Sequence, residues 1–76
     1  MNISYKELAD CQLYAEHVLN LYKHTNNGSV PESASEAETA VREYNKEWRR
    51  FKDMFGYSIR WYIPVIVECI GYMVEQ

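Results

Sequence analysis

The chain contains 76 residues, of which 47% are hydrophobic and 14% aromatic, and its formal net charge is -3. This apolar content is too high for a disordered polypeptide. A chain of this length is expected to form one domain, over residues 1–76, that buries only ~60% of the surface exposed on unfolding. The small negative charge disfavours contact with bulk nucleic acid or anionic lipid, and it is too small for a DNA mimic.

The first residues, Met1 to Tyr5, lack the basic and apolar regions of a secretory signal, so we expect a cytoplasmic protein. The two cysteines, Cys11 and Cys69, lie far apart and have no C-x-x-C spacing. This pattern argues against a disulfide framework or a zinc site. We expect reduced core thiols, with a single long-range disulfide as the alternative.

The first predicted helix runs from about Tyr5 to His24. Ser4 and Glu7 have the spacing of a capping box, and Ile3 and Leu8 have that of a hydrophobic staple. Apolar residues at helical spacing predict a core-facing side. They are Leu8, Cys11, Ala15, Val18, Leu19 and Tyr22.

Three large apolar residues, Leu13, Tyr14 and Leu21, lie off this face and are either isolated exposed side chains or a second contact surface. The polar residues beside them include His17 and His24. These histidines are two helical turns, roughly 10 Å, apart, so one metal ion cannot bridge them. A catalytic His17 would need a nucleophile or pocket that the sequence does not supply, so we expect a solvated helix face.

A turn at Thr25–Gly28 ends this helix, and three overlapping Ser-x-x-Glu boxes, at Ser29, Ser33 and Ser35, precede the next. We predict a second helix from about Ser33 to Phe55, stopped by Gly56. Its narrow apolar seam has alternating steps of four and three residues, as a buried helix face requires. The seam consists of Ala37, Val41, Tyr44, Trp48, Phe51 and Phe55.

Four basic residues, Arg42, Lys46, Arg49 and Arg50, lie on the exposed side of the second predicted helix. Such a basic face suits phosphate binding, which makes a nucleic-acid-associated regulator the main alternative function. Acidic residues alternate with them at helical pair spacing, so ordinary surface ion pairs or an acidic protein partner explain them better.

The C-terminal segment, Tyr57 to Val74, is apolar on almost every side. Pro64 falls within it, so the helix begins at Ser58 and kinks, or begins at Pro64 itself. Alternating Ile, Val and Trp residues leave a β-strand as a second interpretation. The segment is too short and too charged to span a bilayer, although peripheral association with a membrane remains an alternative.

If this segment is helical, only a narrow polar strip interrupts its apolar surface. A helix that is apolar nearly all round is normally buried on most sides, and two helices of the same chain are too few to enclose it. We therefore expect a second subunit or another protein to cover part of it. Glu68 then either meets water on the strip or makes a specific contact with the partner. The strip consists of Arg60, Pro64, Glu68 and Gly71.

Together these features predict an all-α domain, a helical hairpin of near-antiparallel helices closed by a kinked apolar C-terminal helix, forming a homodimer or docked on a partner. The predicted function is a non-enzymatic protein-binding adaptor or inhibitor, of the kind that small viral and phage proteins use against a host protein. We expect no cofactor and no metal ion. The predicted contact residues are Leu21, Arg49, Arg50, Trp61, Val65 and Tyr72.

Overall fold

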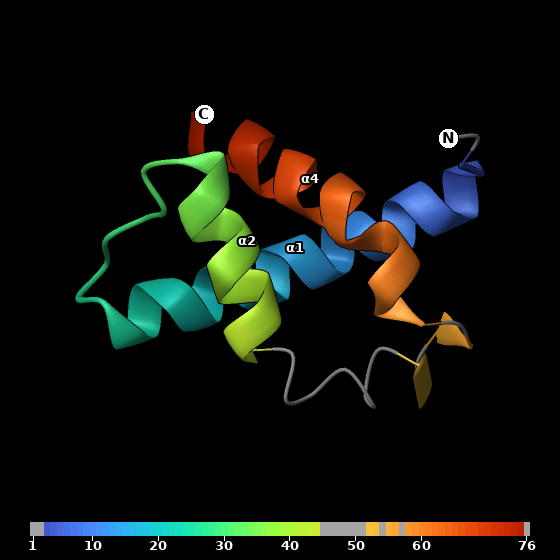
Figure 1. Ribbon diagram of the computed structural model, residues 1–76, viewed down its shortest axis with the longest axis horizontal. Helices are drawn as coiled ribbons and strands as arrows, with labels where there is room; N and C mark the ends of the chain where they lie inside the picture. The colour runs from blue at the N-terminus through green and yellow to red at the C-terminus, as the bar shows by residue number, and fades with distance from the viewer. Residues whose placement is uncertain (1–2, 45–51, 54, 57, 76) are drawn as a thin grey trace.

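The computed structural model describes residues 3–44, 52–53, 55–56 and 58–75. Over these residues the chain forms helix α1 (Tyr5–Thr25), helix α2 (Ala34–Glu43), the 3-10 turn η2 (Ile59–Tyr62) and helix α4 (Ile63–Glu75) (Figure 1). No strand occurs in this part of the chain, which confirms the all-α prediction with three helices and makes the β interpretation of the C-terminal segment wrong. None of the described helices has the length and apolarity needed to cross a bilayer.

Helix α1 begins where the capping box predicts. The hydroxyl of Ser4 accepts the backbone N–H of Glu7 at 3.1 Å, and this bond satisfies one of the donors that a helix start leaves open. Ile3 and Leu8 are both half-buried against the core, as a hydrophobic staple requires. At the other end, Asn27 and Gly28 take positive φ angles of 55° and 84°, and the N–H of Gly28 donates to Lys23 at 2.7 Å.

Ser33 is the cap of α2, which settles the choice among the three overlapping boxes. Its hydroxyl accepts the N–H of Glu36 at 3.1 Å, and the Glu36 carboxylate in turn accepts the N–H of Glu32 at 2.8 Å. The helix ends at Glu43 because Tyr44 adopts a ψ of -4°, away from the α-helical value. Helix α2 is therefore shorter than the helix predicted to Phe55, of which residues 45–51 and 54 lie outside the described part of the chain. Lys52, Asp53 and Phe55 are again helical, and the predicted stop at Gly56 is confirmed by its φ of 84° and by its N–H, which donates to Lys52 at 2.7 Å.

The kinked start predicted for the C-terminal helix is the turn η2. Ser58 caps this turn by accepting the N–H of Arg60 at 3.2 Å, and the α-helix begins at Ile63. Pro64 thus stands in the first turn of α4, where its missing N–H breaks no helical hydrogen bond. The Tyr62 hydroxyl donates to the carboxylate of Glu7 and so joins η2 to the start of α1.

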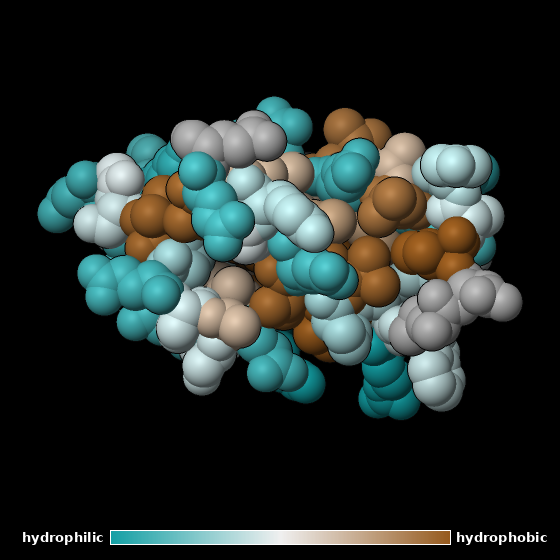
Figure 2. All heavy atoms as spheres, turned by 90° about the horizontal axis from the view of Figure 1, so that it is seen from above, coloured by the Kyte–Doolittle hydropathy of each residue, from teal (hydrophilic) through white to brown (hydrophobic). Residues whose placement is uncertain are grey.

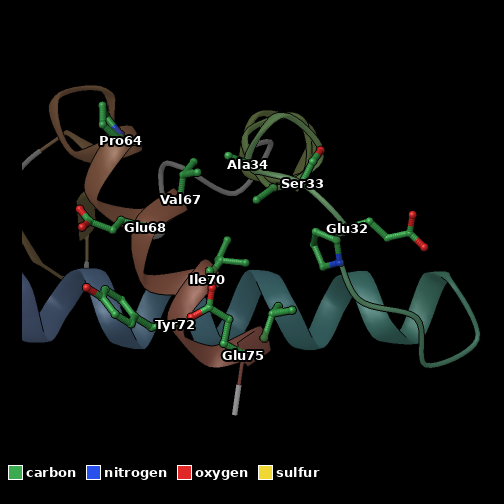
Figure 3. Close-up of a pocket in the computed structure, with 13 residues that line it drawn as sticks. Glu32, Ser33, Ala34, Pro64, Val67, Glu68, Ile70, Tyr72 and Glu75 are labelled. Carbon is green, nitrogen blue, oxygen red and sulfur yellow. The ribbon is translucent and has the colours of Figure 1, made fainter.

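The helices do not form the predicted antiparallel hairpin. Helix α2 crosses α1 steeply instead of running back along it, and Figure 3 views α2 end-on while α1 lies across the picture (Figures 1 and 3). Helix α4 packs extensively against both α1 and α2, whereas α1 and α2 contact each other much less. The near-antiparallel arrangement is therefore wrong, and α4 provides most of the contact that joins the other two helices.

The core gathers residues from all three helices. Val18, Val41 and Ile66 are completely buried, and the predicted apolar face of α1 lies in the core, with its end residues half-buried. Tyr14 and Asp10 are also buried, so this side of α1 is not the fully solvated face that the sequence predicts. Because both α2 and α4 pack on α1, more of the circumference of α1 is buried than the one apolar face that the sequence predicts. The Lys6 ammonium, 3.0 Å from the Asp10 carboxylate, offsets the burial of this acid.

Candidate protein-binding surface

The solvent-facing side of α4 is the strongest candidate for a functional surface. Its opposite side is buried through Ile63, Ile66, Cys69 and Ile70. The exposed side, called here the α4 ridge, contains the part of the predicted polar strip that lies on this helix and extends beyond it, whereas the strip's first residue, Arg60, is exposed on η2. Figure 2 looks onto this part of the molecule and shows apolar side chains in separate patches across the face, with hydrophilic groups between them. The α4 ridge consists of Pro64, Glu68, Gly71, Tyr72 and Glu75.

A groove of ≈ 680 Å³ lies between α4 and the beginning of α2. Val67 points across it toward Ala34, whereas Glu68 and Tyr72 project from the other side of α4 (Figure 3). Ala37 and Ile70, both buried core residues, contribute to the floor. The α2/α4 groove is therefore apolar at its base and open to solvent above.

A second groove, of ≈ 580 Å³, lies between α4 and the middle of α1. Leu13 and Ala9 from α1 line it opposite Tyr72 and Met73 from α4. Tyr72 lines both grooves, and its ring projects from the side of α4 away from the α2/α4 groove (Figure 3). The α1/α4 groove brings Leu13 into the candidate surface. The sequence allowed this residue to be either an isolated exposed side chain or part of a second contact surface, and its place in the groove agrees with the latter.

Only a few of the large apolar side chains in the described part of the chain are exposed to solvent. Trp61 is 70% exposed and Tyr72 is 64% exposed, while Leu13 is 57% exposed. The remaining apolar residues of α4 are buried or half-buried against α1 and α2. The helix is thus more fully enclosed by its own chain than the sequence predicted, and among the described residues the large apolar side chains left exposed are these three and Tyr5.

The charge around Tyr72 has one sign. Glu32, Glu68 and Glu75 line the α2/α4 groove, and Glu16 lines the α1/α4 groove. No lysine, arginine or histidine lines either groove among the described residues. Figure 3 shows that Glu32 points away from α4, so Glu68 and Glu75 are the carboxylates of the α4 ridge itself. The surface combines an exposed aromatic ring, apolar hollows and negative charge.

The predicted contact residues are only partly brought together. Trp61 is exposed on η2 and Tyr72 on the last turns of α4, but Val65 is half-buried against the core. Leu21 is half-buried near the far end of α1 and lines neither groove. Arg49 and Arg50 lie outside the described residues. Sequence reasoning missed Glu16 and Glu75, since nothing in the sequence indicates which acidic residues flank an exposed tyrosine.

The chemistry of the other candidate groups is limited. Cys11 and Cys69 are free, buried thiols, and burial together with the neighbouring Cys69 raises the pKa of Cys11 to about 12. Such thiols are poor nucleophiles, because only the thiolate reacts. The ring of His17 lies beside that of Tyr14, with centroids 6.1 Å apart. Within the described ranges, no three metal-binding side chains gather at one point.

Of the four residues in the predicted basic face of the second helix, only Arg42 lies in the described part of the chain. Its guanidinium lies 3.1 Å from the Glu38 carboxylate, one helical turn away, with both side chains exposed. This is the surface pairing that the alternating charges of the sequence predict. Comparison of the chain with protein-family models, with curated proteins and with solved structures gives no match.

Proposed function

We propose that this chain is a non-enzymatic protein-binding module, an adaptor or inhibitor that docks on a larger protein through the α4 ridge and its two grooves. The observation that carries the proposal is the position of Tyr72, a largely exposed aromatic residue on the helix that separates the two apolar grooves, both of which it lines. Tyrosine and tryptophan dominate the binding energy of protein interfaces, because they bury a large area and retain a polar group.

The enclosure of α4 supports this function. Its other apolar side chains stabilise the domain by packing inside it, so the exposed position of Tyr72 and Trp61 is available for binding. A partner that covers Tyr72 would also cover Leu13, which lines the same groove. Two adjacent large apolar groups are a typical centre for a small interface.

A helical domain without a recognisable catalytic motif suits a viral or phage regulator that inhibits a host protein. We include an inhibitor of this kind in the proposal. Nucleic-acid binding through the basic residues of the second predicted helix is less well supported, because Arg42 pairs with Glu38 and the α4 ridge carries carboxylates.

Affinity capture from the native cells of the protein tests the proposal. We expect the native chain to retain a specific partner, Tyr72→Ala to retain much less of it, and Trp61→Ala to reduce it to a smaller extent. Tyr5→Ala is the matched control, because Tyr5 is 94% exposed and lines neither groove. Equal capture by Tyr72→Ala and the control contradicts the proposed surface.

Light scattering on the same proteins separates a foreign partner from self-association. A homodimer whose mass falls to that of a monomer in Trp61→Glu assigns the exposed tryptophan to self-association. The larger partner is then expected on the α4 ridge, where Tyr72→Ala is the informative change.

A further inference from the structure

We propose that the partner segment that docks on the α4 ridge is a cationic amphipathic helix, with its apolar side chains entering the two grooves and its basic side chains pairing with Glu68 and Glu75. This inference rests on the proposed function and adds the chemistry of the partner. It depends on the charge of the surface and on the spacing of its groups.

The negative charge of the ridge lacks compensation within the described part of the chain. The two carboxylates of α4 have no ion-pair partner there, in contrast to Asp10 and Glu38, which pair with Lys6 and Arg42. Glu16, in the α1/α4 groove, adds a third acidic group beside Tyr72. Complementary charge guides protein association and determines partner choice, so a basic partner fits this surface.

The end of α4 strengthens this preference. The last turn of the helix contains no basic residue and ends in Glu75. A helix C-terminus carries a partial negative charge, to which Glu75 adds a charge of the same sign. A lysine or arginine from a partner would interact favourably with both. The start of α2, at the same groove, is already capped by Ser33 and the Glu36 carboxylate.

The spacing of the ridge fits a helix. Glu68 and Glu75 are seven residues apart on α4, which corresponds to two turns or about 10 Å. Basic residues at positions i and i+7 of a partner helix are the same distance apart, so both can reach a carboxylate. The ridge from Pro64 to Glu75 is about 16 Å long, enough to contact three turns of a helix. Apolar residues at i, i+3 and i+4 would then straddle Tyr72 and enter both grooves.

A second copy of the chain is a poorer occupant. In a two-fold symmetric dimer the same patch lies on both subunits, so the carboxylates of one ridge would face those of the other. Like charges placed together disfavour such a contact. The net charge of -3 acts in the same direction. A foreign basic segment avoids this repulsion.

A fluorescent peptide tests the inference by anisotropy. The probe is an amphipathic helix of about 18 residues, or five turns, with leucine on one side and lysine on the other. The control peptide has glutamate in place of every lysine. We expect saturable binding of the lysine peptide to the native chain, weaker binding as salt increases, and no binding of the glutamate peptide.

Two sets of variants locate the contact. We expect the double variant Glu68→Gln, Glu75→Gln to bind the lysine peptide about fivefold or more weakly, the effect of losing two exposed ion pairs. Tyr72→Ala should weaken it at least as much. The matched control is Glu43→Gln with Asp53→Asn, two exposed acids outside both grooves that change the net charge equally.

Four outcomes would overturn the inference, of which the last leaves the protein-binding function in place. The first is the absence of saturable binding of the lysine peptide, and the second is an equal loss in the control variant, which would indicate attraction to net charge alone. The third is a dimer in light scattering that Tyr72→Ala dissociates, since a second copy then covers the ridge. If affinity capture depends on Tyr72 but not on Glu68 and Glu75, the protein-binding function stands and the basic partner is wrong.

Discussion

The hydroxyl of Tyr62 donates a hydrogen bond to the carboxylate of Glu7, 55 positions earlier in the chain. The same carboxylate accepts a hydrogen bond from the Ser4 hydroxyl at 2.9 Å. The bond from Tyr62 is the main cause of a lowered pKa at Glu7, and the same bond is the main cause of a raised pKa at Tyr62. This contact fixes the turn η2, and with it the beginning of α4, against the first turn of α1.

The pH dependence of stability should reflect this contact. Because the pKa of Glu7 is lowered on folding from 4.5, its contribution is present above that value and is lost as the pH falls through the folded pKa. Because the pKa of Tyr62 is raised from 10.0, its contribution is present below pH 10.0 and is lost as the pH rises through the folded pKa. We expect Tyr62→Phe to be less stable than the native chain between these limits.

Urea unfolding of both proteins from pH 3 to pH 11 measures this difference. The difference in the free energy of unfolding should be largest between pH 4.5 and 10.0 and should shrink at both ends. Tyr5→Phe, at a tyrosine on the surface, should match the native chain throughout. A difference for Tyr62→Phe that does not vary with pH would mean that the hydroxyl does not stabilise the Glu7 carboxylate.

Shortening Ile66 should destabilise the domain strongly. This side chain is completely buried on α4, the helix that packs against both others. We expect Ile66→Val to cost about 1 kcal/mol and Ile66→Ala ~2–5 kcal/mol, because the cavity is only partly refilled. A small domain has a free energy of unfolding of roughly 5 kcal/mol, so the alanine variant should be largely unfolded or close to it. Urea unfolding and circular dichroism measure both changes.

The cap of α2 offers a test with two internal controls. Ser33→Ala should lower the free energy of unfolding by about 1 kcal/mol, since the N–H of Glu36 loses its acceptor. Ser29→Ala and Ser35→Ala remove the other serines that begin overlapping boxes and should have much smaller effects. Similar losses for all three serines in thermal unfolding would indicate that the cap is shared among them.

The buried thiols should resist modification while the chain is folded. With its pKa raised to about 12, Cys11 exists as thiolate in only about one molecule in 10⁴ at pH 8, and burial also raises the pKa of Cys69. We expect a disulfide reagent such as DTNB to label both thiols far more slowly in buffer than in urea. Rapid labelling of the folded protein would show that the α1 and α4 packing around these residues opens easily.

The local features of the fold could be predicted from the sequence. Capping at Ser4, the turn at Asn27 and Gly28, and the position of Pro64 each depend on a few neighbouring residues. The direction of α2 could not be predicted in this way. The connection from Asn26 to Ser33 is long enough for an antiparallel or a crossed arrangement, and in the crossed one α4 packs against both other helices.

The candidate surface was predictable only in part. Of the three contact residues that the sequence predicts in the C-terminal segment, Trp61 and Tyr72 are exposed. Val65 packs against the core because α4 is covered from two sides. Leu13 and Glu16 join the surface through tertiary contact, since α4 packs beside the middle of α1 and places Tyr72 in the same groove. No spacing within the sequence contains that information.

Photocrosslinking in native cells tests most directly whether the α4 ridge is a partner surface. A photoreactive phenylalanine derivative replaces Tyr72 in one protein and Tyr5 in another, two exposed positions of which only the first lines the grooves. We predict an adduct with a larger protein from position 72 and none from position 5. The same adducts from both positions, or no adduct from position 72 in cells where the protein is active, would contradict the account.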